Sequence, residues 1–137
     1  MKDDPGMTRS PLSALLVLGL LCATGAEAQS LNELRTRLQA TLQRSLGRSM
    51  LGGALPHVDL ATGAVTRYYP TENHEIILRM DDIYVMCATL VSENGDEAPV
   101  DYYIAESDGR FGVIRMEIDN RAPLHALMDA GRAARLE

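Results

Sequence analysis

Two turn dipeptides, each set between short apolar segments, place the strongest restriction on how this chain can fold. Asn94-Gly95 and Asp108-Gly109 separate residues 83–91, 100–105 and 111–118, which are rich in β-branched, aromatic and other apolar residues. Asn-Gly and Asp-Gly readily adopt the positive φ angles that a two-residue hairpin turn requires. The sequence therefore predicts that these three segments are consecutive antiparallel strands.

The residues before them extend the predicted meander to about six strands. Residues 55–60 and 64–69 flank a hairpin-sized gap that contains Gly63, and Pro70 is expected to close this pair. Residues 74–80 form a further short strand, which a tight turn joins to the next one.

The alternation of side chains along the strands indicates how the sheet is covered. Both alternating sets are apolar in residues 83–91, which is typical of a central strand that is covered on both faces. Residues 100–105 and 111–118 alternate more clearly between apolar and polar side chains. We therefore expect a helix on one sheet face and a partly polar surface on the other. The apolar sets of these two strands are Val100, Tyr102 and Ile104, and Ile114, Met116 and Ile118.

Helices are predicted at both ends of the meander. In residues 30–50, five leucines recur at spacings of three and four, which places them on one helix face. Ser30 and Glu33 fit a capping box, so this helix should begin at Ser30, and Gly52-Gly53 should end it. Residues 123–136 form a shorter C-terminal helix. The predicted fold is α+β: an N-terminal amphipathic helix packed on an antiparallel β-meander of about five to six strands, with a short C-terminal helix.

The N-terminal 28 residues have the pattern of a cleavable signal peptide. Arg9 precedes an uncharged apolar run at residues 14–23, and Ala26 and Ala28 stand at the −3 and −1 positions of a cleavage site before Gln29. The run is much shorter than the roughly 20 residues that cross a bilayer as a helix, so no stable membrane anchor is expected. Met7 gives a more typical beginning than residues 1–6, and is a candidate true start. Residues 29–137 are then one α+β domain in the bacterial periplasm.

The composition of residues 29–137 restricts the possible partners. This part has 11 arginines, no lysine and 16 acidic residues, a net charge of −5. An acidic chain without a basic cluster argues against nucleic acid and anionic membranes as partners. Its one cysteine, Cys87, cannot form an internal disulfide, and its apolar segment favours a buried free thiol in a monomer over a bridge between chains.

No arrangement of residues nominates a catalytic, metal or cofactor site. His57, His74 and His125 lie in separate segments, and no close pair of cysteines and histidines has the spacing of metal ligands. A nucleophile elbow and a glycine-rich phosphate loop are also lacking, so enzymatic activity is not favoured, and no cofactor or metal is expected.

Tyrosine and arginine side chains of the strands are the candidate binding residues. The chain has five tyrosines, one phenylalanine and no tryptophan, and four of the tyrosines form adjacent pairs. Adjacent strand residues face opposite ways, and the parity predicts that Tyr102 is core while Tyr103 and Arg115 lie on the more polar face. Tyrosine and arginine are enriched where binding energy concentrates. The candidate binding residues are Tyr103, Arg115, Arg79, Tyr69 and Arg67.

Two functions remain open. The leading hypothesis is a non-catalytic periplasmic accessory domain that binds an envelope protein through its polar sheet face or an edge strand. The alternative is a small-ligand carrier with a pocket between helix and sheet. A cavity above roughly 300 Å³ would favour the carrier, and a filled core would favour the protein-binding module.

Overall fold

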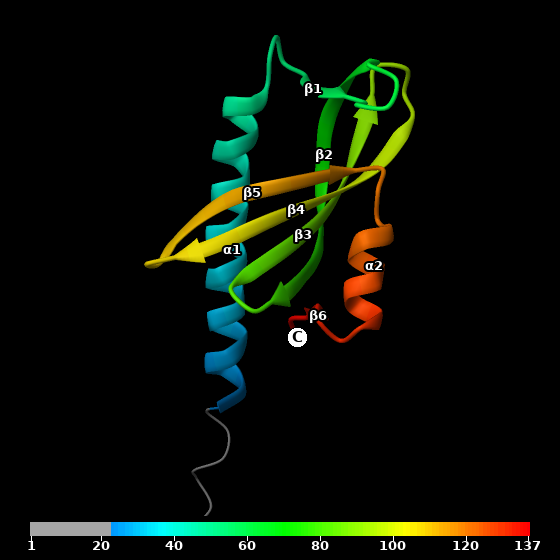
Figure 1. The fold of residues 1–137 in the computed structure, drawn as a ribbon. Helices are drawn as coiled ribbons and strands as arrows, with labels where there is room; N and C mark the ends of the chain where they lie inside the picture. Colours follow the sequence, from blue (N-terminus) through cyan, green and yellow to red (C-terminus); the bar gives the residue numbers. More distant parts are fainter. Residues whose placement is uncertain (1–22) are drawn as a thin grey trace, which may run out of the picture.

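An N-terminal helix, an antiparallel sheet and a short second helix make up the part of the chain that the structure describes. This computed structural model describes the backbone of residues 23–137, and side chains at residues 30–71 and 76–137. Residues 1–22, with Met7 and most of the apolar run of the predicted signal peptide, lie outside it. The elements are α1 (Ala23–Ser49), β1 (Leu55–Val58), β2 (Val65–Met80), β3 (Ile83–Ser92), β4 (Glu97–Ser107), β5 (Arg110–Ile118), α2 (Ala122–Asp129) and β6 (Ala134–Arg135). The predicted α+β fold is confirmed (Figure 1).

The sheet is a meander in which each strand pairs with the next one along the chain. The strand order is β1-β2-β3-β4-β5, and β6 pairs with β2. Asp108-Gly109 has the backbone of a two-residue hairpin turn, with φ of 52° and 71°, whereas a four-residue connection at 93–96 joins β3 to β4 and takes a positive φ of 88° at Gly95. Local turn chemistry therefore determines the topology of β3, β4 and β5.

Strand β2 is longer than the sequence predicted, because it continues through Pro70 instead of ending there. The register of β2 against β3 shifts on either side of Asn73, so bulges interrupt the pairing in this stretch. β1 pairs only as far as Tyr68, and β6 pairs with Leu78 and Arg79. Pro70 thus lies where only β3 is bonded to β2, and bulged or unpaired positions tolerate a residue that has no amide hydrogen.

Helix α1 packs its leucine face against one face of the sheet, as expected. Leu38 and Leu42 are fully buried, and Leu46 is nearly so. They contact strand residues that include Tyr102, and they belong to the larger of two cores. The helix begins at Ala23 and not at Ser30, so the predicted capping box is wrong: Ser30 lies inside the helix, where its own amide is part of the helical ladder.

The opposite face of the sheet is covered in part by α2. This helix has proline in its first turn, and it ends at Asp129, well before the predicted end at residue 136. Gly131, at a φ of 68°, reverses the chain so that the last residues pair with β2 as β6. Leu124 of α2 packs with Val85 in the second core. The sheet is therefore covered by α1 on one face and in part by α2 on the other.

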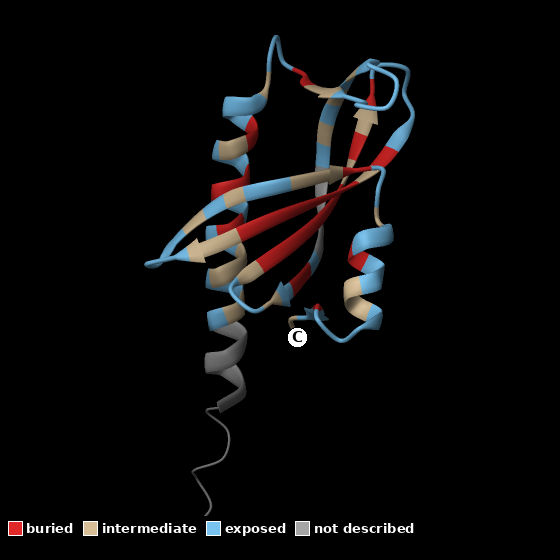
Figure 2. Cartoon of the chain, in the orientation of Figure 1, coloured by how far each residue is buried: buried red, intermediate tan, exposed pale blue. Residues whose placement is uncertain are grey.

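β3 is a central strand, as predicted. Seven of its ten positions are buried, residues of β3 belong to both cores, and buried residues run along β3 and β4 in Figure 2. Cys87 is buried at 6% exposure and has no disulfide partner among the described residues.

Among residues 23–137, no helix is both long and apolar enough to span a bilayer.

Candidate functional site

Strand β5 forms one edge of the sheet and has an open side. It spans nine residues, Arg110–Ile118, and pairs with β4 alone among the described strands. An edge strand presents backbone amide and carbonyl groups that are free to pair with another extended chain. β5 is thus a physically suitable place for β-strand addition.

A bulge in β5 turns an apolar side chain outward. Tyr103 is opposite Arg115 and Ile104 is opposite Val113, so Ile114 has no partner on β4. Its side chain is 61% exposed. The prediction that Ile114 shares the inner set with Met116 was wrong, because the extra residue reverses the alternation at that point.

A groove runs between β5 and α1. It has a volume of about 230 Å³ and is open to solvent. Its apolar lining includes Leu42 and Leu46 of α1, Tyr102 of β4 and Met116 of β5, while Ser45 and Ser49 supply hydroxyl groups. Figure 1 shows α1 and β5 crossing, and the packing of Val113 and Met116 against the α1 leucines confirms their contact. An extended chain added to β5 would place alternate side chains over this groove.

The two elements that border the groove carry a net positive charge in an acidic chain. Helix α1 and strand β5 together have six arginines and three glutamates, a formal charge of +3, whereas the whole chain has −6. At the groove, the exposed guanidinium of Arg115 forms an ion pair with Glu117. Hydrogen bonds from Asn120 and from Arg115 hold the pKa of Glu117 below its usual value. The surroundings of the groove therefore favour an acidic segment.

A second basic position lies at the other end of β5. Arg37 of α1 donates a hydrogen bond of 2.7 Å to the carbonyl oxygen of Gly109, and its guanidinium carbon lies 4.5 Å from the centroid of the Phe111 ring. These contacts fix the helix to the β4–β5 turn.

The predicted exposure of Tyr103 is wrong. Its side chain is only 7% exposed and packs with Leu78, Val85 and Leu124 in the core under α2. Burial raises the pKa of Tyr103. The parity was correct, since Tyr103 and Arg115 are opposite each other, but α2 covers this face at Tyr103 and not at Arg115. Tyr102 is core, as predicted, at 1% exposure.

The remaining predicted binding residues do not meet in one place. Arg79 is exposed near the C-terminal end of β2, where its guanidinium carbon lies 5.6 Å from the centroid of the Tyr84 ring. Arg67 and the 45%-exposed Tyr69 lie near the other end of β2, separated from Arg79 by roughly 30 Å of extended chain. Of the predicted set, only Arg115 lines the groove.

Sequence reasoning considered a pocket between helix and sheet in the carrier alternative, but it did not identify the residues of this groove or its position at β5. Strand order was not readable, so nothing marked β5 as the edge, and the groove residues come from four different elements. The leucine face of residues 30–50 was recognised, but only as core.

Neither a metal centre nor a resemblance adds to this geometry. Within the described side chains, no three histidine, cysteine, aspartate or glutamate residues gather closely enough to hold a metal ion. His74 lies outside the described side chains. Comparisons with known protein families, curated proteins and solved structures gave no match.

Proposed function

We propose that this chain is an exported, non-catalytic module that binds a partner protein by adding an extended segment of that partner to strand β5. The open edge of β5 beside the α1 groove is the observation that carries the proposal. Main-chain hydrogen bonds to the edge supply affinity, and the groove selects the side chains.

The segment that fits is extended, acidic and apolar at alternate positions. Apolar side chains meet Leu42, Leu46 and Met116 in the groove, and acidic ones meet the excess of arginine on α1 and β5. The groove volume of about 230 Å³ is too small for a drug-sized ligand, and the groove lies open along the free edge of β5, which supports an extended protein segment at this site over the carrier alternative.

The periplasm is the proposed compartment. This rests on the apolar run at residues 14–23 and the Ala26-x-Ala28 pattern before Gln29. The partner is then an envelope protein with an extended segment that reaches the β5 edge.

Site-specific photocrosslinking in the native cells tests the proposal. A photoreactive amino acid at Ile114 should form an adduct with the partner. The same amino acid at Val65 is the control, because Val65 is 57% exposed on β2, which β3 and β4 separate from β5 in the sheet. The crosslinked partner peptide should be rich in acidic residues. Adducts from Val65 and none from Ile114 would refute the β5 site.

Matched substitutions provide the second measurement. Ile114→Asp removes an apolar contact and repels an acidic segment, so it should weaken binding of the crosslinked partner at least about tenfold. Val65→Asp makes the same change on an exposed strand position outside the groove and should leave binding within about twofold. Equal effects of the two variants would contradict the proposed surface.

A further inference from the structure

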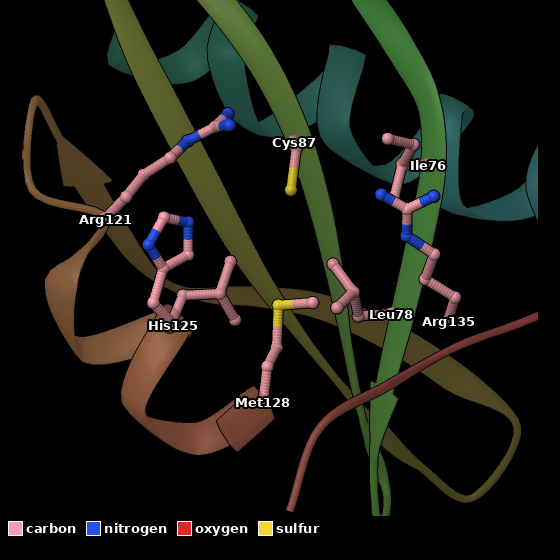
Figure 3. Close-up of a pocket in the computed structure, with 8 residues that line it drawn as sticks. Ile76, Leu78, Cys87, Arg121, His125, Met128 and Arg135 are labelled. Carbon is pink, nitrogen blue, oxygen red and sulfur yellow. The ribbon is translucent and has the colours of Figure 1, made fainter. Parts of the chain in front are cut away.

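A second cavity lies on the opposite face of the sheet, between α2 and the strands. Its volume is about 230 Å³. The walls are Leu124, His125 and Met128 of α2, Ile76 and Leu78 of β2, Cys87 of β3, and two arginines that flank α2 in the sequence, Arg121 and Arg135. Figure 3 shows the two guanidinium groups on either side of Cys87, with His125 and Met128 reaching in from the helix.

A buried carboxylate holds one of these arginines. Asp101 is fully buried, and its Oδ1 lies 3.4 Å from Nη2 of Arg121. Neither of its oxygens makes a hydrogen bond of normal geometry to another described residue, although the Cys87 thiol lies beside it on the neighbouring strand. A buried carboxylate is costly unless a charge compensates it. Asp101 therefore fixes Arg121 at the cavity and offsets its charge.

Arg135 supplies a positive charge that is not offset. It belongs to β6, which pairs with Leu78 of β2, so its backbone is fixed at the cavity wall. None of the ion pairs formed by the described side chains includes Arg135. Asp101 balances Arg121, which leaves the guanidinium of Arg135 as a positive charge at the cavity without an ion-pair partner among the described side chains. That charge matches a monoanion.

The rest of the cavity is apolar and small. Leu78 and Leu124 are buried, and Ile76 and Met128 form its more exposed walls. A volume of 230 Å³ equals that of about eight water molecules in the liquid. This is enough for a ligand of about eight non-hydrogen atoms, and too little for a nucleotide or a drug-sized molecule.

We infer that the cavity between α2 and the sheet binds a small monocarboxylate with a short aliphatic chain, whose carboxylate meets Arg135 and Arg121 and whose chain lies on Leu78, Leu124 and Met128. Arg135 is the recognition residue. Asp101 is a positioning residue that acts through Arg121. The site lies on the face opposite the β5 groove, so its test is independent of the partner-binding proposal.

The test is a titration with hexanoate that is monitored by NMR. The amide signals are those of the isotope-labelled protein, purified from cells that express the full chain. Hexanoate should bind saturably below about 20 mM and shift the signals of Leu78, Cys87 and Leu124. Hexanol, which has the same chain without the charge, and inorganic phosphate, which has the charge without the chain, should each bind at least about fivefold more weakly.

Two arginine variants make the test specific. Arg135→Gln should weaken hexanoate at least about fivefold, because a charge-assisted hydrogen bond is lost. Arg132→Gln is the control: this side chain is 68% exposed, lies outside the cavity and makes only a long ion pair of 3.9 Å with Asp81. No saturable binding of hexanoate, equal binding of hexanol or phosphate, or equal effects of the two variants would each overturn the inference.

Discussion

Replacement of Leu38 by alanine tests how α1 is held against the sheet. Leu38 is fully buried in the larger core. The change removes three carbon atoms, which at about 0.8 kcal/mol each amounts to about 2.4 kcal/mol of lost burial. The cavity that remains adds to this, so the free energy of unfolding should fall by about 2–5 kcal/mol.

Urea denaturation measures this loss, and Leu60→Ala is the matched control. Leu60 is 94% exposed in the β1–β2 turn, so the same substitution there should change the free energy of unfolding by less than about 0.5 kcal/mol. With a slope of about 1.5 kcal/mol per molar urea, Leu38→Ala should lower the midpoint by about 2 M.

The refuting result is a small effect at Leu38. If Leu38→Ala and Leu60→Ala have the same midpoint within error, α1 does not pack on the sheet in solution. The groove between α1 and β5 would then not exist as described, and the proposed binding site would fail with it.

Three further predictions concern export, the thiol and one carboxyl group. Mass spectrometry of the exported protein should show an N-terminus at Gln29, whereas an intact mass that includes residues 14–23 would contradict cleavage. Burial raises the pKa of Cys87 to about 12 from 9.0, so its thiolate fraction near pH 8 should be about a thousandfold lower than in the unfolded chain, and alkylation of the native protein should be correspondingly slow. A disulfide-linked dimer on non-reducing gels would contradict this. Asn120→Ala removes the hydrogen bond that lowers the pKa of Glu117, so that pKa, measured by NMR titration, should rise toward 4.5. The difference in the free energy of unfolding between the original protein and the variant should have its full size above about pH 5. It should disappear as the pH falls below the lowered pKa of Glu117.

The sequence predicted well those features that depend on neighbouring residues. The hairpin connections at Asn94-Gly95 and Asp108-Gly109 take positive φ angles at Gly95, Asp108 and Gly109, which few residue types accept, so they were readable. The leucine face of α1 and the double burial of β3 followed from periodicity, which depends only on the spacing of side chains.

The features it missed depend on contacts between distant segments. Tyr103 was assigned to the exposed surface because nothing in β4 shows that α2 covers it. Pro70 was taken as a strand end because its tolerance depends on how far β1 extends along β2. Ile114 changed sides through a bulge that alternation alone does not reveal.

The candidate site was the least predictable part. Of the five residues proposed from the sequence, Arg115 lines the groove, Tyr103 is core, and the other three lie elsewhere on β2. A groove between a helix and an edge strand requires the strand order, and strand order follows from the whole meander and not from any one segment.

Amide hydrogen exchange of β5, with and without the crosslinked partner's segment, tests the central claim most directly. In the free protein, the β5 amides that face away from β4 should exchange quickly, since nothing among the described strands pairs with them. Binding should protect these amides within Arg110–Ile118, because new main-chain hydrogen bonds form there. Protection confined to another segment, such as β1, with β5 unchanged, would contradict the account.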